Sequence, residues 1–315
     1  MRRILTILTL LVLQTLTLSA QKVVFTPQWT PQSQFAGYYV ALEKGFYAEE
    51  GIDVEIRHTG INSTDTPLDM LVRGDANIAG LQLIQGIVAR SDGRPLVNVM
   101  QLTQVSGLGC ISREPISKPE DLDGKKISRW KTGYAEVSDM IEFYNKIHIE
   151  WIPVISGVSL FLYDAVDATL CYTYSEYLSV LLARGEIPEG NFVRFADFGF
   201  DCPEDGLYVT EDYYNTHRKE VDAFVRASKK GWEYAASHRN EALDVVMKYT
   251  DESEIITNRA HQKMMLDEFL KLQVNPYTSK IDFMPVSREV FDQICGALID
   301  TGYISIRPEY KDLIR

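Results

Sequence analysis

The chain has 315 residues, of which 45% are hydrophobic and 24% charged, an ordinary globular composition that is long enough for two domains of moderate size. The formal net charge is −12, and without Arg2 and Arg3 it is −14, from 30 basic and 44 acidic residues. An acidic surface repels phosphate backbones, so we expect no nucleic-acid partner.

The first twenty residues have the layout of a secretory signal peptide. Met1, Arg2 and Arg3 form a basic start, the uncharged apolar run ILTILTLLVLQTLTL follows, and LSA precedes Gln21. The run is short for a transmembrane helix, although an uncleaved N-terminal anchor is the alternative. No cysteine follows it, which argues against a lipid anchor. We therefore expect residues 1–20 to be removed and the mature protein to be soluble and periplasmic.

Strands and helices alternate over the first hundred residues. We expect strands over residues 22–27, 52–56, 77–81 and 95–102, and helices over 35–45, 66–74 and 82–93. Gly45 is placed to end the first helix, whereas Thr66, Pro67 and Asp69 form the N-cap, first position and capping box of the second, which Gly74 ends.

A second α/β series follows, and then only helices. We expect strands at 107–114, 148–154, 167–174, 191–198 and 206–210, a capped turn feeding a short strand at 117–128, and helices at 135–147, 157–165, 175–185, 218–238, 240–250, 254–272 and 287–304. Helices that alternate with strands in this way indicate right-handed βαβ units and mainly parallel sheets.

This order of elements allows two arrangements. The helical tail forms a third domain, or the chain crosses between two lobes near Gln104–Cys110 and returns near Cys202–Tyr208. We favour the second arrangement, with residues 21–105 and 205–315 in lobe 1 and residues 106–204 in lobe 2. Two adjacent crossovers then make a hinge with a cleft between the lobes.

Four cysteines are present, Cys110, Cys171, Cys202 and Cys295, without a CxxC pair or a histidine at ligand spacing. A zinc site is therefore unsupported, and we expect no metal. An exported protein can oxidise Cys110 with Cys202, but we favour small buried thiols.

The segment WTPQSQFAGYYVALEKGFYAEEGIDV resembles the start of the thiamine-pyrimidine-synthase-like and sulfonate/nitrate-binding group of type II periplasmic binding proteins. The matching positions are Trp29, Pro31, Ala36, Gly37, Tyr39, Ala41, Lys44, Gly45, Phe46, Glu50, Gly51, Asp53 and Val54. Further matches follow in order at Lys118–Ile127, Val166–Tyr177, Phe195–Thr210 and Asn240–Thr250. The resemblance implies a two-lobed α/β clamp that captures a small solute and passes it to an ABC permease and ATPase in the inner membrane.

Ligands of open parallel sheets bind beyond the C-terminal ends of the strands, at helix N-termini. In lobe 1 we expect contacts from Trp29, Gln34, Tyr38, Asn62 and Gln82, with Gln32, Ser33 and Ser63 beside them. The alternative for residues 28–34 is an ordinary N-cap loop with Trp29 packed in the core.

In lobe 2 we expect contacts from Trp130, Thr132, Tyr134, Tyr172, Tyr174 and Glu176, which follow predicted strands. Ser175 stands where related chains often carry Asn, and Glu176 is alternatively a first-turn acid favoured by the helix dipole. The aromatic residues suit a planar heterocycle such as a thiamine-precursor pyrimidine. A sulfonate or nitrate site is the second choice, because Arg129 is the one obvious arginine near these loops.

The fungal members of the group make the thiamine pyrimidine with iron from their own histidine and pyridoxal phosphate, and carry a cysteine-rich run. The corresponding place here is FDCPE, with Cys202 alone. The sequence also shows no nucleophile–base pair, phosphate loop or HExxH motif, so we expect a monomeric binding protein without a cofactor. A secreted subunit that presents its ligand to a membrane sensor is a further alternative.

We predict cleavage of the exported protein near Ala20–Gln21, because the basic, apolar and small-residue layout ends there. Intact mass spectrometry of the exported protein checks this. A mature species that keeps Met1 or Arg2 would show that the segment is an anchor.

Overall fold

The computed structural model describes residues 21–60, 63–131 and 135–315. The predicted signal peptide lies outside the described residues, as do Asn62, Thr132 and Tyr134. Within the described part of the chain, no helix has both the length and the apolar character needed to cross a membrane.

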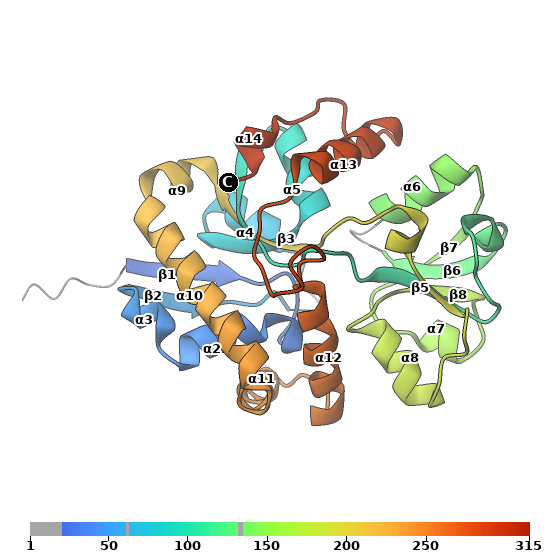
Figure 1. The fold of residues 1–315 in the computed structure, drawn as a ribbon, viewed down its shortest axis with the longest axis horizontal. Coiled ribbons are helices and arrows are strands. Elements are labelled where there is room, and N and C mark those ends of the chain that lie inside the picture. Colours follow the sequence, from blue (N-terminus) through green and yellow to red (C-terminus); the bar gives the residue numbers. More distant parts are fainter. Residues whose placement is uncertain (1–20, 61–62, 132–134) are drawn as a thin grey trace, which may run out of the picture.

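The strands form two separate five-stranded sheets, one in each lobe (Figure 1). Their bounds are β1 (Gln21–Thr26), β2 (Ile52–Ile56), β3 (Ile78–Gln82), β4 (Leu96–Gln101), β5 (Leu108–Ser112), β6 (Lys126–Trp130), β7 (Glu150–Val154), β8 (Ala168–Tyr172), β9 (Phe192–Arg194) and β10 (Asp205–Thr210). The strand order is β2-β1-β3-β10-β4 in lobe 1 and β7-β6-β8-β5-β9 in lobe 2. The predicted two-lobed α/β fold with two crossovers is therefore confirmed.

The expectation of mainly parallel sheets holds for four strands of each sheet, but one strand of each runs against the others. β10 is antiparallel to β3 and β4, and β5 is antiparallel to β8 and β9. Both strands directly follow a crossover. Each therefore starts at the edge of its sheet where the parallel strands end, and this edge faces the other lobe.

The helices cover both sheets and form the tail of the chain. They are the α-helices α2 (Ala36–Glu43), α3 (Phe46–Glu49), α4 (Pro67–Arg73), α5 (Leu83–Ser91), α6 (Glu136–Asn145), α7 (Ser159–Leu162), α8 (Glu176–Arg184), α9 (Glu211–Thr216), α10 (Arg218–Ser237), α11 (Arg239–Glu252), α12 (Arg259–Leu272), α13 (Arg288–Asp300) and α14 (Tyr310–Leu313), with 3-10 turns η1 (Ser33–Phe35), η2 (Pro119–Leu122) and η3 (Phe195–Phe198). The predicted capping box of α4 is confirmed, and Gly45 and Gly74 end their helices with φ of 74° and 81°.

Several short elements differ from the prediction, and among them α3 and α14 were not expected. The helix expected over 157–165 is a single turn, α7, and the second half of the strand expected over 191–198 is η3. α9 was not predicted. It continues directly from β10, and the Thr210 hydroxyl caps it by accepting from the Tyr213 amide at 3.2 Å.

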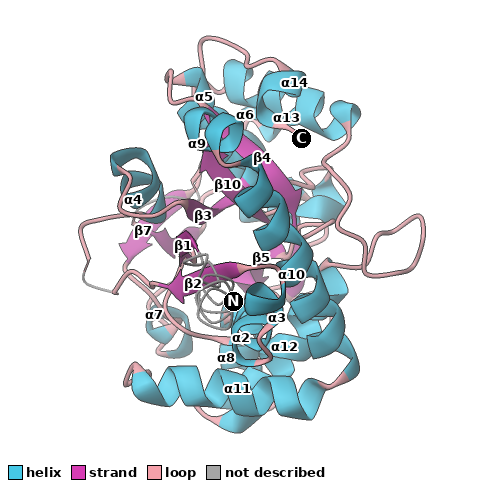
Figure 2. Ribbon diagram, turned by 90° about the vertical axis from the view of Figure 1, so that its left-hand side faces the viewer, coloured by secondary structure: helices cyan, strands magenta, loops and turns pink. Residues whose placement is uncertain are grey.

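The helical tail packs on lobe 1, as predicted. α10 lies against α2 and α3, and α11 lies against α2 (Figure 2). Close approach of α10 and α2 depends on two glycines. A Cβ at Gly231 would lie 2.1 Å from the Gly37 carbonyl oxygen, and a Cβ at Gly37 would lie 2.2 Å from the ring of Trp232, which is fully buried.

The two crossovers, residues 102–107 and 199–204, are joined by carboxylates of the second one. Glu204 is 3% exposed and accepts hydrogen bonds from the Ser106 hydroxyl at 2.5 Å and the Gly107 amide at 3.0 Å. Asp201 accepts from the Ser106 amide at 2.6 Å. Burial raises the pKa of Glu204 to about 8. The hinge ranges predicted from the sequence overlap these crossovers but run into β5 and β10.

Replacing Gly231 by alanine should lower the free energy of unfolding by about 1–3 kcal/mol, since a methyl group there forces α10 away from α2. Gly296→Ala is the matched control, because Gly296 is also helical but has no atom within 4 Å of a built Cβ. The control should be neutral or stabilising by about 0.5–1 kcal/mol through helix propensity. Urea denaturation measures both, and equal stability of the two variants would contradict the close approach.

Glu204 should make the protein less stable as pH rises. Its folded pKa of about 8 exceeds the unfolded value of about 4.3, so the contribution to stability is complete below about pH 4.3 and is lost as pH rises through about 8. Glu204→Gln should therefore flatten the melting temperature between about pH 5 and pH 8. Glu114→Gln, at an exposed carboxyl, should leave the wild-type profile unchanged. Parallel profiles for wild type and Glu204→Gln would show that this carboxyl ionises normally.

Candidate functional site

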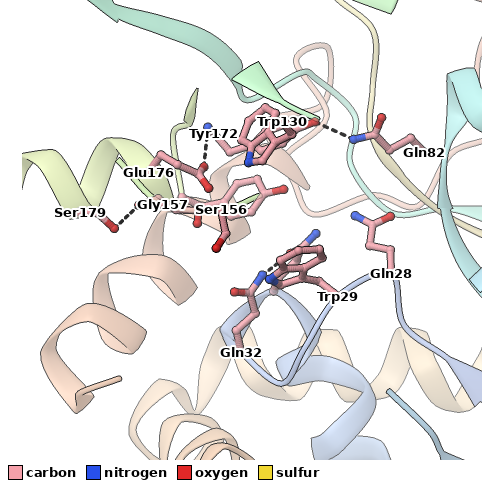
Figure 3. A pocket seen from close by; sticks show the side chains of 13 residues that line it. Gln28, Trp29, Gln32, Gln82, Trp130, Ser156, Gly157, Tyr172, Glu176 and Ser179 are labelled. Atoms are coloured by element: carbon pink, nitrogen blue, oxygen red, sulfur yellow. Dashed lines mark hydrogen bonds between the residues drawn. The ribbon is translucent and has the colours of Figure 1, made fainter. Parts of the chain in front are cut away.

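A cavity of about 210 Å³ lies between the two lobes. Its described lining residues are Gln28, Trp29, Gln32, Gln34 and Gln82 from lobe 1, and Trp130, Ser156, Gly157, Tyr172, Tyr174, Ser175, Glu176 and Ser179 from lobe 2. They lie at or just beyond the C-terminal ends of β1, β3, β6, β7 and β8, where the predicted architecture puts a ligand. Figure 3 shows Trp29 and Gln32 on one side of the cavity and Trp130, Tyr172 and Glu176 on the other.

The lobe 2 wall is an aromatic ladder. Trp130 stacks on Tyr172 with ring centroids 5.3 Å apart, and Tyr172 stacks on Tyr174 at 5.2 Å. Tyr174 meets Phe269 of α12 edge-on at 5.0 Å. The stacking holds these rings in fixed orientations, so the wall is a rigid apolar surface before any ligand binds.

A hydrogen bond joins the lobes at the cavity itself. The Gln82 amide, at the end of β3, donates to the Tyr172 hydroxyl at 2.6 Å (Figure 3). Both side chains are buried. The bond therefore couples the position of lobe 1 to the aromatic ladder of lobe 2.

Glu176 supplies a carboxyl group on the lobe 2 side. It is the first residue of α8, and its Oε2 accepts from the Tyr172 backbone amide at 3.2 Å. Burial raises its pKa, while backbone hydrogen bonds at Tyr172 and Glu176 act in the opposite direction. Ser179, one turn along α8, also lines the cavity.

Trp29 is partly buried and is held through its backbone. Its carbonyl oxygen accepts from His58 Nδ1 at 2.5 Å, and His58 Nε2 lies 2.8 Å from the Tyr39 hydroxyl. Burial lowers the pKa of His58 to about 4, so the imidazole is neutral near pH 7. Because the carbonyl can only accept, the Nδ1 proton is fixed and Tyr39 donates to Nε2.

The lobe 1 wall contains three glutamine amides next to Asp205, the first residue of β10. The Nε2 groups of Gln28 and Gln34 donate to Asp205 at 2.5 and 2.8 Å, and Gln32 Nε2 donates to Gln34 Oε1 at 2.5 Å. Burial raises the pKa of Asp205 to about 7, and the two amide donors lower it.

Among the described residues that line the cavity, none is lysine or arginine. Arg129, the arginine considered from the sequence, forms an ion pair with Asp139 at 2.5 Å and lies over the Trp151 ring at 4.5 Å. The cavity therefore offers acceptors and aromatic surface, with the Glu176 carboxyl as its one lining acid in the described part of the chain.

A second cavity of about 420 Å³ adjoins the first and shares Gln28, Trp29 and Trp130 with it. Its other walls include Leu68 of α4 and Val88 of α5 in lobe 1 and Ile155 in lobe 2, so it also lies between the lobes. Unlike the described lining of the first cavity, its lining includes cationic residues, Arg94 and Lys131.

Seven of the eleven predicted site residues line the first cavity: Trp29, Gln34, Gln82, Trp130, Tyr172, Tyr174 and Glu176. Tyr38 does not. Its ring is 3% exposed and packs on Phe25 at 4.7 Å and edge-on to Trp232 at 5.7 Å, because this face of α2 is turned to the core. Asn62, Thr132 and Tyr134 lie outside the described residues.

Ser33 is also not at the cavity, because its amide donates to the side chain of Gln262 in α12 and its hydroxyl to the Gln262 carbonyl, both at 2.7 Å. Ser156, Gly157 and Ser179 line the cavity but were not predicted to do so. Ser156 and Gly157 directly follow the strand predicted over residues 148–154, so their position in the sequence could have indicated them. Gln28 and Asp205 were not predicted either.

The four cysteines are buried and unpaired, in agreement with the favoured prediction. Burial raises the pKa of Cys110 to about 12. No group of three or more potential metal ligands occurs among the described residues.

Comparisons with known proteins place these features in context. The formylaminopyrimidine-binding protein of Halalkalibacterium halodurans is 26% identical over 262 residues, 79% of this chain and 76% of that protein. The riboflavin-binding protein RibY of Chloroflexus aurantiacus is 25% identical, over 82% of this chain and 75% of its own. The 4-amino-5-hydroxymethyl-2-methylpyrimidine phosphate synthase THI11 of Saccharomyces cerevisiae is 23% identical, over 69% and 68%.

The fold is shared with solved structures. The periplasmic aliphatic sulphonate binding protein SsuA of Escherichia coli matches with a TM-score of 0.66 at 13% identity, covering 93% of this chain and 97% of that one. The family model described as NMT1/THI5 like matches residues 32–242, more than half of the chain. This protein therefore belongs to the NMT1/THI5-like family.

Proposed function

We propose that this protein is the periplasmic solute-binding component of an ABC importer and that it holds a small, flat nitrogen heterocycle between its lobes. The observation that carries the proposal is the composition of the cavity. An aromatic ladder and Trp29 supply flat apolar surfaces, Glu176 and glutamine amides supply acceptors, and no described lining residue is cationic. Such a site matches a ring with N–H groups better than an anion.

The size of the cavity supports a single-ring ligand. Its volume of about 210 Å³ is below the roughly 300–1,000 Å³ of sites for drug-sized molecules. A ligand as long as a flavin would extend past Trp29 and Trp130 into the second cavity. We therefore rank a pyrimidine above larger heterocycles.

Names of relatives agree with this ligand class. One relative is named for binding formylaminopyrimidine and another for binding riboflavin, and both compounds are planar nitrogen heterocycles. The solute is proposed to bind as the lobes, bounded at residues 105/106 and 204/205, rotate about the two crossovers.

The proposal is for a binding protein although the THI11 relative is named a synthase. Cys202, which stands at the place of the cysteine-rich run of the fungal proteins, is buried at the hinge and does not line the cavity. The residues that line the cavity are suited to stack on a flat ligand and to accept hydrogen bonds from it, as expected for a binding site.

Wild-type protein should bind 4-amino-5-hydroxymethyl-2-methylpyrimidine in calorimetric titrations, with riboflavin, alkanesulfonates and nitrate as competitors. Trp29→Ala should weaken this binding by roughly tenfold through lost stacking and buried area. Glu176→Gln should weaken it by about tenfold or more, since a hydrogen bond to a charged group is lost. Trp151→Ala is the control, because Trp151 is a partly buried tryptophan of lobe 2 that does not line the cavity.

Binding of an alkanesulfonate or nitrate alone, unaffected by Trp29→Ala, would contradict the heterocycle. A large fall in the melting temperature of unliganded Trp29→Ala would instead show that Trp29 is a core residue. Native mass spectrometry of gently purified protein identifies any solute that remains bound.

A further inference from the structure

Asp205 contacts residues that line the cavity although it stands at the beginning of a strand. Because β10 is antiparallel to its neighbours, its first residue lies at the same edge as the ends of β1 and β3. The side chain is 5% exposed. Its Oδ1 accepts from Gln28 Nε2 at 2.5 Å and its Oδ2 from Gln34 Nε2 at 2.8 Å.

An ionised carboxylate can only accept hydrogen bonds, so this arrangement fixes the orientation of both amides. The Nε2 groups face Asp205, and the Oε1 atoms are turned away from it. Gln34 Oε1 accepts in turn from Gln32 Nε2 at 2.5 Å, which orients a third amide. One carboxylate thus determines the polarity of three glutamines that line the cavity.

In this arrangement Gln28 Oε1 is a glutamine acceptor that receives no hydrogen bond from the described part of the chain. It is buried and has no hydrogen-bond partner among the described residues. Buried polar atoms are normally paired, so an acceptor in this position calls for a donor from a bound molecule. Gln28 lines both adjoining cavities, so its side chain borders the space in which such a molecule would bind.

The backbone of Asp205 is itself held tightly by the first crossover. Its amide donates to the Thr103 hydroxyl at 3.1 Å, and its carbonyl accepts from the Leu102 amide at 2.8 Å and from Gln101 Nε2 at 3.0 Å. The carboxylate therefore has little freedom to turn, and neither have the amides that depend on it.

We propose that Asp205 is a positioning residue that fixes Gln28 as a hydrogen-bond acceptor and thereby selects ligands that carry an amino group over ligands of the same shape without one. The inference rests on the proposed function, since it concerns the same cavity. Glu176 is an acceptor on the opposite wall of the cavity. A ring with donor groups on two sides can therefore form hydrogen bonds to both lobes.

The test compares two pyrimidines that differ in one group. One is 4-amino-5-hydroxymethyl-2-methylpyrimidine, and in the other a methyl group of similar size replaces the 4-amino group, so the positions of the ring nitrogens are unchanged and both rings are neutral at the pH used. Titrations are made at about pH 8.5, more than one unit above the pKa of about 7 of Asp205, so that the carboxylate is ionised. Wild-type protein should prefer the amino compound by about tenfold or more.

In Asp205→Asn, one of the two acceptor oxygens becomes an NH₂ donor. Gln34 Oε1 already accepts from Gln32, so Gln28 is the glutamine that turns its free oxygen to this donor and its NH₂ away from residue 205. The preference should fall to about threefold or less, through weaker binding of the amino compound. Glu204→Gln is the matched control. Glu204 is the neighbouring buried carboxyl, but it bonds to the hinge and not to the glutamines, so any effect reaches both ligands alike and leaves the ratio unchanged.

Gln28→Met gives a second measurement if Asp205→Asn folds poorly, because it keeps the length of a partly exposed side chain and removes the acceptor. It should reduce the preference as Asp205→Asn does. A full preference in either folded variant, or no preference in wild type, would overturn the role of Asp205. Failure of wild type to bind either pyrimidine would contradict the proposed function instead.

Discussion

Two adjacent buried carboxylates, Glu204 and Asp205, connect the hinge of this protein with its ligand cavity. Glu204 binds the Ser106 hydroxyl and the Gly107 amide of the first crossover, and Asp205 binds Gln28 and Gln34 at the cavity. They are consecutive in sequence, so the contact between the crossovers lies next to the group that orients the amides. Hinge and recognition site share one short segment of backbone.

This arrangement lowers the free energy of unfolding, because two neighbouring carboxyl groups are removed from water. Burial raises the pKa of Glu204 to about 8 and that of Asp205 to about 7. Hydrogen bonds from Ser106, Gly107 and the glutamines offset part of the desolvation, as buried charges require. Replacing either carboxyl by an apolar residue would leave these buried donors without acceptors, so both carboxyls are needed to satisfy their surroundings.

Much of the fold was predictable, because it depends on local signals. The alternation of strands and helices gave the two α/β lobes, and the Thr66–Asp69 capping box and Gly74 gave both ends of α4. The direction of β5 and β10 was not predictable in this way. A strand's own residues do not encode whether its partners are parallel, and here the direction follows from the crossover that precedes each strand.

The same limit explains the errors at the site. Residues at the C-terminal ends of parallel strands, such as Trp130 and Tyr172, were expected at the cavity from their position alone, and both line it. Asp205 was missed because it begins its strand and reaches the site only through the reversed direction of β10. Tyr38 was wrongly included, since a position near a helix N-terminus does not say which face of the helix carries the side chain.

The structure also shows why a shared fold does not settle the ligand. SsuA of Escherichia coli has a similar fold and is named for binding aliphatic sulphonates. An anion needs donors or cations at the strand ends. No described residue that lines the first cavity is cationic, Arg129 is paired with Asp139, and the donor groups of two glutamines face Asp205. The lining of this cavity therefore fits the proposed heterocycle better than an anion. One buried carboxylate can thus decide whether the amide side chains at the strand ends present donors or acceptors to a ligand, without any change of fold.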